Sequence, residues 1–191
     1  FLQTAEYDRM KAERHAAFRD LAERQPAHSG SAYPDKPEAL RTEFGKYFKA
    51  APKRADENGH IGIAAPHVSP IGGWRSYAAA YAHLSGSQDH RTYVVLGTSH
   101  YGTPEKFGLT RKPFVTPYGK LDVDTALVDW IAARAGNSIV MEDYCHSFEH
   151  SIEFQVILLQ YLYGPRVRIL PILCGSFARA LFAGERPEED A

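Results

Sequence analysis

The sequence Cys-His-Ser-Phe-Glu-His-Ser-Ile-Glu occupies residues 145–153 and leads into the apolar run 154–163. As one helix, this segment carries four polar side chains on a single stripe at i, i+3, i+4 and i+7: His146, Glu149, His150 and Glu153. Both flanks of the stripe are apolar, so the helix is expected to be buried. Two imidazoles and two carboxylates in that setting must pair with one another, bind a metal or line a wet pocket.

The start of this helix leaves one alternative open. Ser147 is a suitable N-cap residue, and a helix beginning there would place His146 outside the stripe. A single histidine on a buried helix is most often structural, but a cluster of ionisable groups favours a functional site. Glu149, His150 and Glu153 stay together in either case.

Composition limits the class of protein. The 191 residues suffice for one domain with a substantial core, or one domain with an extension. The net charge of -1 gives no electrostatic case for a nucleic acid or an anionic membrane as partner. No apolar run approaches the roughly 18 residues of a membrane span, and no signal peptide opens the chain. Two cysteines make no disulfide framework, so we expect a cytoplasmic protein.

The chain divides into a helical and a mixed part. Residues 4–24 and 35–48 have helical spacing, and together they predict an N-terminal helical extension over residues 1–50, followed by a polar linker at 52–59. Residues 51–191 then predict an α/β domain with a mixed, largely parallel sheet and flanking helices. The expected strands are 61–65, 92–96, 138–141 and 167–173, the expected helices are 76–84 and 124–134, and 107–121 is expected to form a β-hairpin.

Two further histidines follow predicted strands. His67 comes directly after the strand expected at 61–65, and His100 follows the strand expected at 92–96. Residues just beyond the carboxyl ends of strands line the ligand crevice of open α/β sheets. If these strands are neighbours, both imidazoles reach the same crevice, where the 145–153 segment could join them.

Neutral imidazoles from separate loops are typical ligands of Fe(II), Zn or Cu. We therefore predict His67 and His100 as metal ligands and His150 as an acid or base near neutral pH, with the third ligand left open. Glu149 is the nearest carboxylate in sequence, and we assign it to the same catalytic group. Fe(II) is the expected metal, while ligand softness leaves Zn and Cu open.

Other chemistries fit less well. Residues 146–150 also match H-x-x-E-H, in which two helix histidines bind zinc and the glutamate is a general base, but this leaves His67 and His100 unexplained. Cys145 and His146 are adjacent and do not face each other as a dyad. Cys174, at the end of a predicted strand, is more typical of packing than of a reactive thiol.

Several segments together resemble the MEMO family, whose bacterial members are called AmmeMemoRadiSam system protein B. Six segments resemble patterns of this family, in the family's order. They are residues 28–33 (H-x-G-S-W-Y), 65–67 (A-P-H), 96–100 (L-G-P-S-H), 116–119 (T-P-L-G), 149–153 (E-H-S-I-E) and 169–175 (I-x-P-I-L-x-G). The family is similar in fold to class III extradiol dioxygenases, which use non-haem Fe(II) to open catechol rings. The resemblance implies the same roles for His67, His100 and His150, and it also admits a non-enzymatic binding or adaptor module with a vestigial pocket.

The sequence departs from the family at three places. The A-P-H-A-G-Y continuation reads His-Val-Ser-Pro-Ile from residue 67, the second histidine of S-H-H is Tyr101, and the chain lacks the later S-D-F-[SC]-H segment, so it looks C-terminally incomplete. We expect an extradiol dioxygenase-like pocket in which Glu149, His146 and Glu153 orient the imidazoles. The expected partner is a small aromatic ligand or a partner protein.

Overall fold

The computed structural model describes residues 4–50, 61–84 and 91–186. The linker predicted at 52–59 lies outside the described residues. Within these ranges, no helix has both the length and the apolar character needed to cross a membrane.

A six-stranded mixed sheet forms the centre of the described structure. Three of its pairings are parallel (β1 with β6, β4 with β6, β2 with β5) and two are antiparallel (β3 with β4, β2 with β6). The strands are β1 (Thr92–Thr98), β2 (Phe107–Leu109), β3 (Phe114–Thr116), β4 (Gly119–Val123), β5 (Ile139–Met141) and β6 (Arg168–Cys174). The predicted hairpin at 107–121 is thus confirmed as β3 and β4, with β2 before them.

β6 organises the sheet. It pairs with β1 along its whole length, from Thr92 opposite Arg168 to Thr98 opposite Cys174. Its other edge pairs with β4 near its start and with β2 near its end. Because β1 and β6 are parallel and in register, their carboxyl ends lie together. His100 lies two residues beyond the last residue of β1, at this same edge of the sheet.

Helix α5 (His150–Tyr163) packs on β1 and contributes a large share of the core. Nine of its residues are buried, as the apolar sequence predicts. The helix approaches β1 closely at Gly97, where an added Cβ would lie 2.5 Å from Ile152 Cγ1. The Ser151 hydroxyl donates to the Thr98 carbonyl at 2.9 Å, which fixes the start of α5 at the end of β1.

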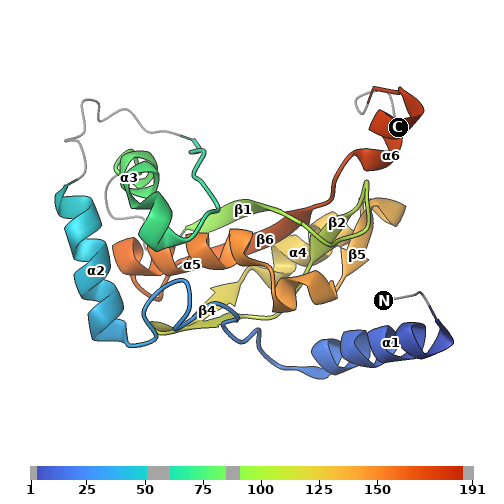
Figure 1. Ribbon diagram of the computed structural model, residues 1–191, viewed down its shortest axis with the longest axis horizontal. Helices are drawn as coiled ribbons and strands as arrows, with labels where there is room; N and C mark the ends of the chain where they lie inside the picture. Colours follow the sequence, from blue (N-terminus) through green and yellow to red (C-terminus); the bar gives the residue numbers. More distant parts are fainter. Residues whose placement is uncertain (1–3, 51–60, 85–90, 187–191) are drawn as a thin grey trace.

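The remaining helices surround this unit (Figure 1). Figure 1 shows α2 and α1 at opposite ends of the view, with α5 between them. Leu40, Phe44 and Tyr47 of α2 are buried in the main core. The bounds are α1 (Ala5–Asp20), α2 (Pro37–Lys49), α3 (Pro70–Tyr81), α4 (Thr125–Ala132) and α6 (Ala178–Ala183), with short 3-10 helices η1 (Gly136–Ser138) and η2 (Tyr144–Ser147). The mixed α/β fold with flanking helices is therefore confirmed.

The prediction of a strand at 61–65 is wrong. These residues have no regular secondary structure, and they form one wall of a cavity whose opposite wall is β1. A short apolar run forms a strand only where a neighbouring strand can pair with it. In the described structure, 61–65 is separated from β1 by the cavity and has no such partner.

Two helix predictions also change. The helix expected at 76–84 begins earlier, at Pro70, because proline is well suited to the first turn of a helix. The helix expected from residue 146 begins only at His150, with Glu149 as its N-cap. His146 belongs to η2, so the four-residue stripe is not continuous on one helix.

Candidate metal centre

Three histidines from separate parts of the chain converge at the carboxyl end of β1. His67, His100 and His150 each offer one ring nitrogen, and these atoms all lie within 4.8 Å of one another. The His150 ring stacks on the His100 ring with centroids 4.9 Å apart, and on the His67 ring at 5.6 Å. The two histidines predicted as ligands and the one predicted as acid or base therefore occupy one site.

His100 is held by Glu149. The buried carboxylate accepts the backbone N–H of His100 at 2.6 Å and lies 2.9 Å from its Nδ1. An ionised carboxylate only accepts hydrogen bonds, so the hydrogen of a neutral His100 ring resides on Nδ1 and leaves a free lone pair on Nε2. A carboxylate on the outer nitrogen is the usual way to orient a metal-binding imidazole. Glu149 thus has the contacts of an orienting residue.

His67 is positioned through its backbone. Gln155 of α5 donates from Nε2 to the Pro66 carbonyl at 3.0 Å, and the Tyr77 hydroxyl of α3 donates to the Val68 carbonyl at 2.9 Å. The residues on either side of His67 are therefore tied to two different helices. This explains how the side chain reaches the site without a regular strand before it.

His150 lies at the first residue of α5 and is half-buried. Burial is the largest cause that lowers its pKa, followed by the nearby His100 ring; Glu149 opposes them, and His28 and His67 lower the pKa further by smaller amounts. The neutral imidazole is the form that binds a metal or accepts a proton. No described residue hydrogen-bonds its ring nitrogens, in contrast to the fixed ring of His100.

Glu153 supports a part of the site that the sequence interpretation missed. Its carboxylate forms an ion pair with the fully buried Arg24 at 2.5 Å and accepts the Tyr33 hydroxyl at 2.5 Å. It also accepts the backbone N–H groups of Ala27 and His28, and lies 3.3 Å from His28 Nδ1. The His28 ring in turn packs edge-on against the ring of His150 at 5.6 Å. A fourth imidazole therefore borders the cluster.

His146 was expected to orient these imidazoles, but its ring packs elsewhere in the structure. Its Nε2 is 3.1 Å from the Gly108 carbonyl, and the ring packs edge-on against Phe114. Burial lowers its pKa to about 4, so the ring is neutral near pH 7 and donates to Gly108. His146 therefore has the contacts of a structural residue, and the H-x-x-E-H zinc arrangement loses one of its histidines.

Nucleophilic chemistry at Cys145 also finds no support in the geometry. The thiol is buried, and burial, together with the neighbouring Asp143 carboxylate, raises its pKa to about 12. The thiol is consequently protonated near pH 7 and unreactive.

The donor set of the cluster fits a transition metal. Three imidazoles that are partly exposed to solvent, one of them oriented by a carboxylate, match the ligand preferences of Fe(II), Zn and Cu. The carboxylates nearest to the cluster, Glu149 and Glu153, are both engaged by histidine Nδ1 and backbone N–H groups. The ring nitrogens are therefore the available donors.

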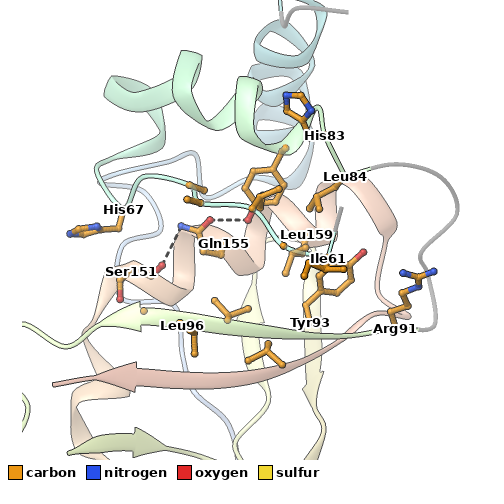
Figure 2. Close-up of a pocket in the computed structure, with 18 of the residues that line it drawn as sticks. Ile61, His67, His83, Leu84, Arg91, Tyr93, Leu96, Ser151, Gln155 and Leu159 are labelled. Atoms are coloured by element: carbon orange, nitrogen blue, oxygen red, sulfur yellow. Dashed lines mark hydrogen bonds between the residues drawn. The ribbon is translucent and has the colours of Figure 1, made fainter. Parts of the chain in front are cut away.

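A cavity of about 670 Å³ begins beside the cluster. Figure 2 shows His67 at one end of its lining and Arg91 at the other, with Gln155 and Leu159 of α5 between them. The Tyr81 hydroxyl donates to Gln155 Oε1 at 2.8 Å within this wall. Of the three clustered histidines, His67 alone lines the cavity in the described part of the chain. The volume suits a small organic molecule.

Comparison with known proteins places these residues in a family. The family model described as Memo-like protein matches residues 24–181. A MEMO1 family protein of Methanosarcina acetivorans is 36% identical over 152 residues, which cover 80% of this chain and 54% of that protein. The MEMO1 family proteins of Methanococcoides burtonii and Aquifex aeolicus are 33% and 30% identical, with 80% and 78% of this chain covered and 54% and 39% of theirs.

The chain spans about half the length of the curated relatives it matches. The matched region includes α2 to α5, the whole sheet, the three clustered histidines, and Arg24 and His28. The resemblance noted from the short sequence motifs is thereby confirmed over most of the chain, which belongs to the Memo-like protein family.

Proposed function

We propose that this chain carries a non-haem metal pocket, and that the protein oxidises a small aromatic ligand as class III extradiol dioxygenases do. The observation that supports the proposal is the convergence of His67, His100 and His150 within 4.8 Å. His67 and His100 would hold Fe(II), because both are fixed by contacts outside the cluster. Bound Fe(II) would supply the redox chemistry with dioxygen.

His150 is suited to the proton transfer in this proposal. Its ring nitrogens are free of hydrogen bonds to described residues, and its lowered pKa keeps the ring neutral and able to accept a proton. The hydroxyl group of an aromatic ligand is the natural proton donor. Glu149 would keep the lone pair of His100 Nε2 directed into the pocket.

Oxygen consumption tests the proposed activity. Anaerobic protein loaded with Fe(II) would be mixed with a panel of catechols in buffer containing oxygen, and uptake would be measured with an electrode. Ring opening places both oxygen atoms in the product, so oxygen and catechol should disappear in equal amounts without added reductant. His150→Gln should take up metal but turn over at least 100-fold more slowly. Uptake without loss of the catechol would contradict the proposal.

A binding module is the second candidate, and one observation favours it. Leu181 and Phe182, neighbours on α6, are 66% and 92% exposed. Exposed apolar side chains of this size are suited to contact with a partner protein. Protein that holds no Fe(II), yet binds a partner protein through these two side chains, would favour the module over the enzyme.

A further inference from the structure

Two glutamates of the α5 N-terminus hold two histidines in the same way. Glu149 accepts the backbone N–H of His100 at 2.6 Å, and its second oxygen lies 2.9 Å from His100 Nδ1. Glu153 accepts the backbone N–H of His28 at 3.0 Å, and its second oxygen lies 3.3 Å from His28 Nδ1. The glutamates are four residues apart, about one helical turn, so the two pairs flank His150.

The second pair fixes the tautomer of His28. Burial would raise the pKa of Glu153, but the Arg24 guanidinium, the Tyr33 hydroxyl and the His28 backbone N–H hold it below its usual value. The ionised carboxylate accepts hydrogen bonds only, so the hydrogen of a neutral His28 ring resides on Nδ1. His28 Nε2 then presents a free lone pair, as His100 Nε2 does.

The position of His28 differs from that of the three clustered histidines. Its ring lies edge-on to His150 and to Phe154, each with centroids 5.6 Å apart. It is not among the histidines whose ring nitrogens all lie within 4.8 Å of one another. Its side chain is 28% exposed, so a small molecule can reach it. His28 thus lies beside His150 and is open to solvent, outside the group of histidines that could hold a metal.

We propose that His28 contacts the ligand of this pocket, and that its Nε2 accepts a hydrogen bond from a hydroxyl group of a small hydroxylated molecule such as a phenol or catechol. The inference rests on the proposed function, because the ligand is taken to bind beside a metal held by His67 and His100, with His150 next to it as the proton acceptor. It adds a specificity-determining residue from the segment before α2, far from the other site residues in sequence.

The two ring nitrogens of His28 can be tested separately. In His28→Asn the side-chain amide can occupy the place of Nδ1 and keep the bond to Glu153, while the position of Nε2 is lost. The probe is 4-nitrocatechol, titrated by absorbance into Zn-loaded protein, in which the metal does not oxidise the probe. His28→Asn should hold the same amount of zinc as wild type and bind 4-nitrocatechol about 10-fold more weakly. His15→Asn, on α1, is the matched control and should behave as wild type.

A second probe makes the test independent of stability. 4-Nitroveratrole has both hydroxyl groups methylated, so it has no hydrogen that His28 could accept. For each protein, the dissociation constant of this probe is divided by that of 4-nitrocatechol. This ratio should be about 10-fold larger for wild type than for His28→Asn. Because partial unfolding of the variant would weaken the binding of both probes by the same factor, it leaves the ratio of the two affinities unchanged and would not imitate this result.

Three results would overturn the inference, and they differ from one another. Equal affinity of wild type and His28→Asn for 4-nitrocatechol would show that His28 does not contact the ligand. Loss of zinc from His28→Asn, as complete as from His67→Ala, would make His28 a metal ligand instead. Wild type that holds no metal would remove the proposed function, and the inference with it.

Discussion

Glu149 binds His100 at two points, the backbone N–H at 2.6 Å and ring Nδ1 at 2.9 Å, although Glu149 is itself the N-cap residue of α5. Its side chain makes no capping hydrogen bond to the helix that it begins. A carboxylate at this position would ordinarily stabilise the first turn of the helix. Here it fixes the position and the tautomer of a histidine that follows β1.

Replacing this carboxylate should weaken metal binding. Glu149→Gln keeps the shape of the side chain but can no longer act as an acceptor at both oxygens. Loss of such an orienting partner usually reduces metal affinity by about 10- to 100-fold. Competition with a coloured chelator measures the change. Glu13→Gln, in an exposed pair on α1, should leave the affinity unchanged. An unchanged affinity in Glu149→Gln would show that His100 needs no orientation.

Arg24 should matter far more for stability than an exposed arginine. It is fully buried, pairs with Glu153, and donates to the carbonyl groups of His146 and Glu149 at 2.8 and 3.0 Å. Arg24→Met removes the guanidinium that neutralises the buried Glu153 charge, which should cost about 3–5 kcal/mol in the free energy of unfolding.

The control is Arg111→Met, whose ion pair with Asp129 has side chains 44% and 55% exposed. Exposed pairs contribute about 0–1 kcal/mol. Urea unfolding of both variants gives the comparison. Similar losses in Arg24→Met and Arg111→Met would contradict the role assigned to the buried pair.

His146 should make stability fall as the solution becomes acidic. Its pKa is about 4 in the folded chain and 6.5 as a free group. Between these values the unfolded state binds a proton that the folded state does not, so the free energy of unfolding decreases as the pH falls below about 6.5. The slope approaches about 1.4 kcal/mol per pH unit between the two pKa values and is smaller close to each of them, so the loss from pH 6.5 to 4.5 is roughly 2 kcal/mol.

His146→Gln isolates this contribution, because glutamine can donate to the Gly108 carbonyl but does not titrate. Carboxylates with lowered pKa values, such as Glu142 and Glu153, contribute stability that is lost only below about 4.5 in both proteins. Urea unfolding at several pH values should give a shallower decline for the variant between pH 6.5 and 4.5. Parallel curves would refute a neutral, buried His146.

Two glycine substitutions should have opposite effects. In Gly97→Ala the new Cβ would lie 2.5 Å from Ile152 Cγ1 and 2.6 Å from Ser151 Oγ, so β1 and α5 must separate. The expected loss is about 1–3 kcal/mol. In Gly72→Ala the new Cβ meets nothing within 4 Å, and helix α3 should gain roughly 0.5–1 kcal/mol. Thermal unfolding distinguishes the two; equal shifts would show that α5 does not depend on this close approach.

Much of the site was predictable because its parts have local signals. His100 follows an apolar strand, and His150 is the first residue of a helix whose apolar side chains indicate that it is buried. His67 was assigned correctly to the cluster for a partly wrong reason, since the run before it forms no strand. The backbone contacts of Pro66 and Val68 position it instead, and such contacts leave no periodic pattern in the sequence.

Arg24 and His28 could not be found in that way. They lie more than 120 residues before Glu153. Arg24 is the last residue of the segment predicted as a helix at 4–24, and His28 lies just beyond it, between the two predicted helices. The resemblance of residues 28–33 to a family pattern was the available signal, and it identified no partner for His28. Pairing a buried arginine with a carboxylate on α5 requires the tertiary structure, because a single sequence does not say which distant charges meet.

Metal content measures the central claim most directly. Protein prepared without oxygen would be loaded with Fe(II), freed of excess metal and analysed beside His67→Ala, His100→Ala and His15→Ala. Wild type and His15→Ala should hold about one metal per chain, and the other two variants should lose it, because ligand deletion removes a donor that no described residue replaces. Wild type without metal, or equal metal in all four proteins, would contradict a metal centre formed by these histidines.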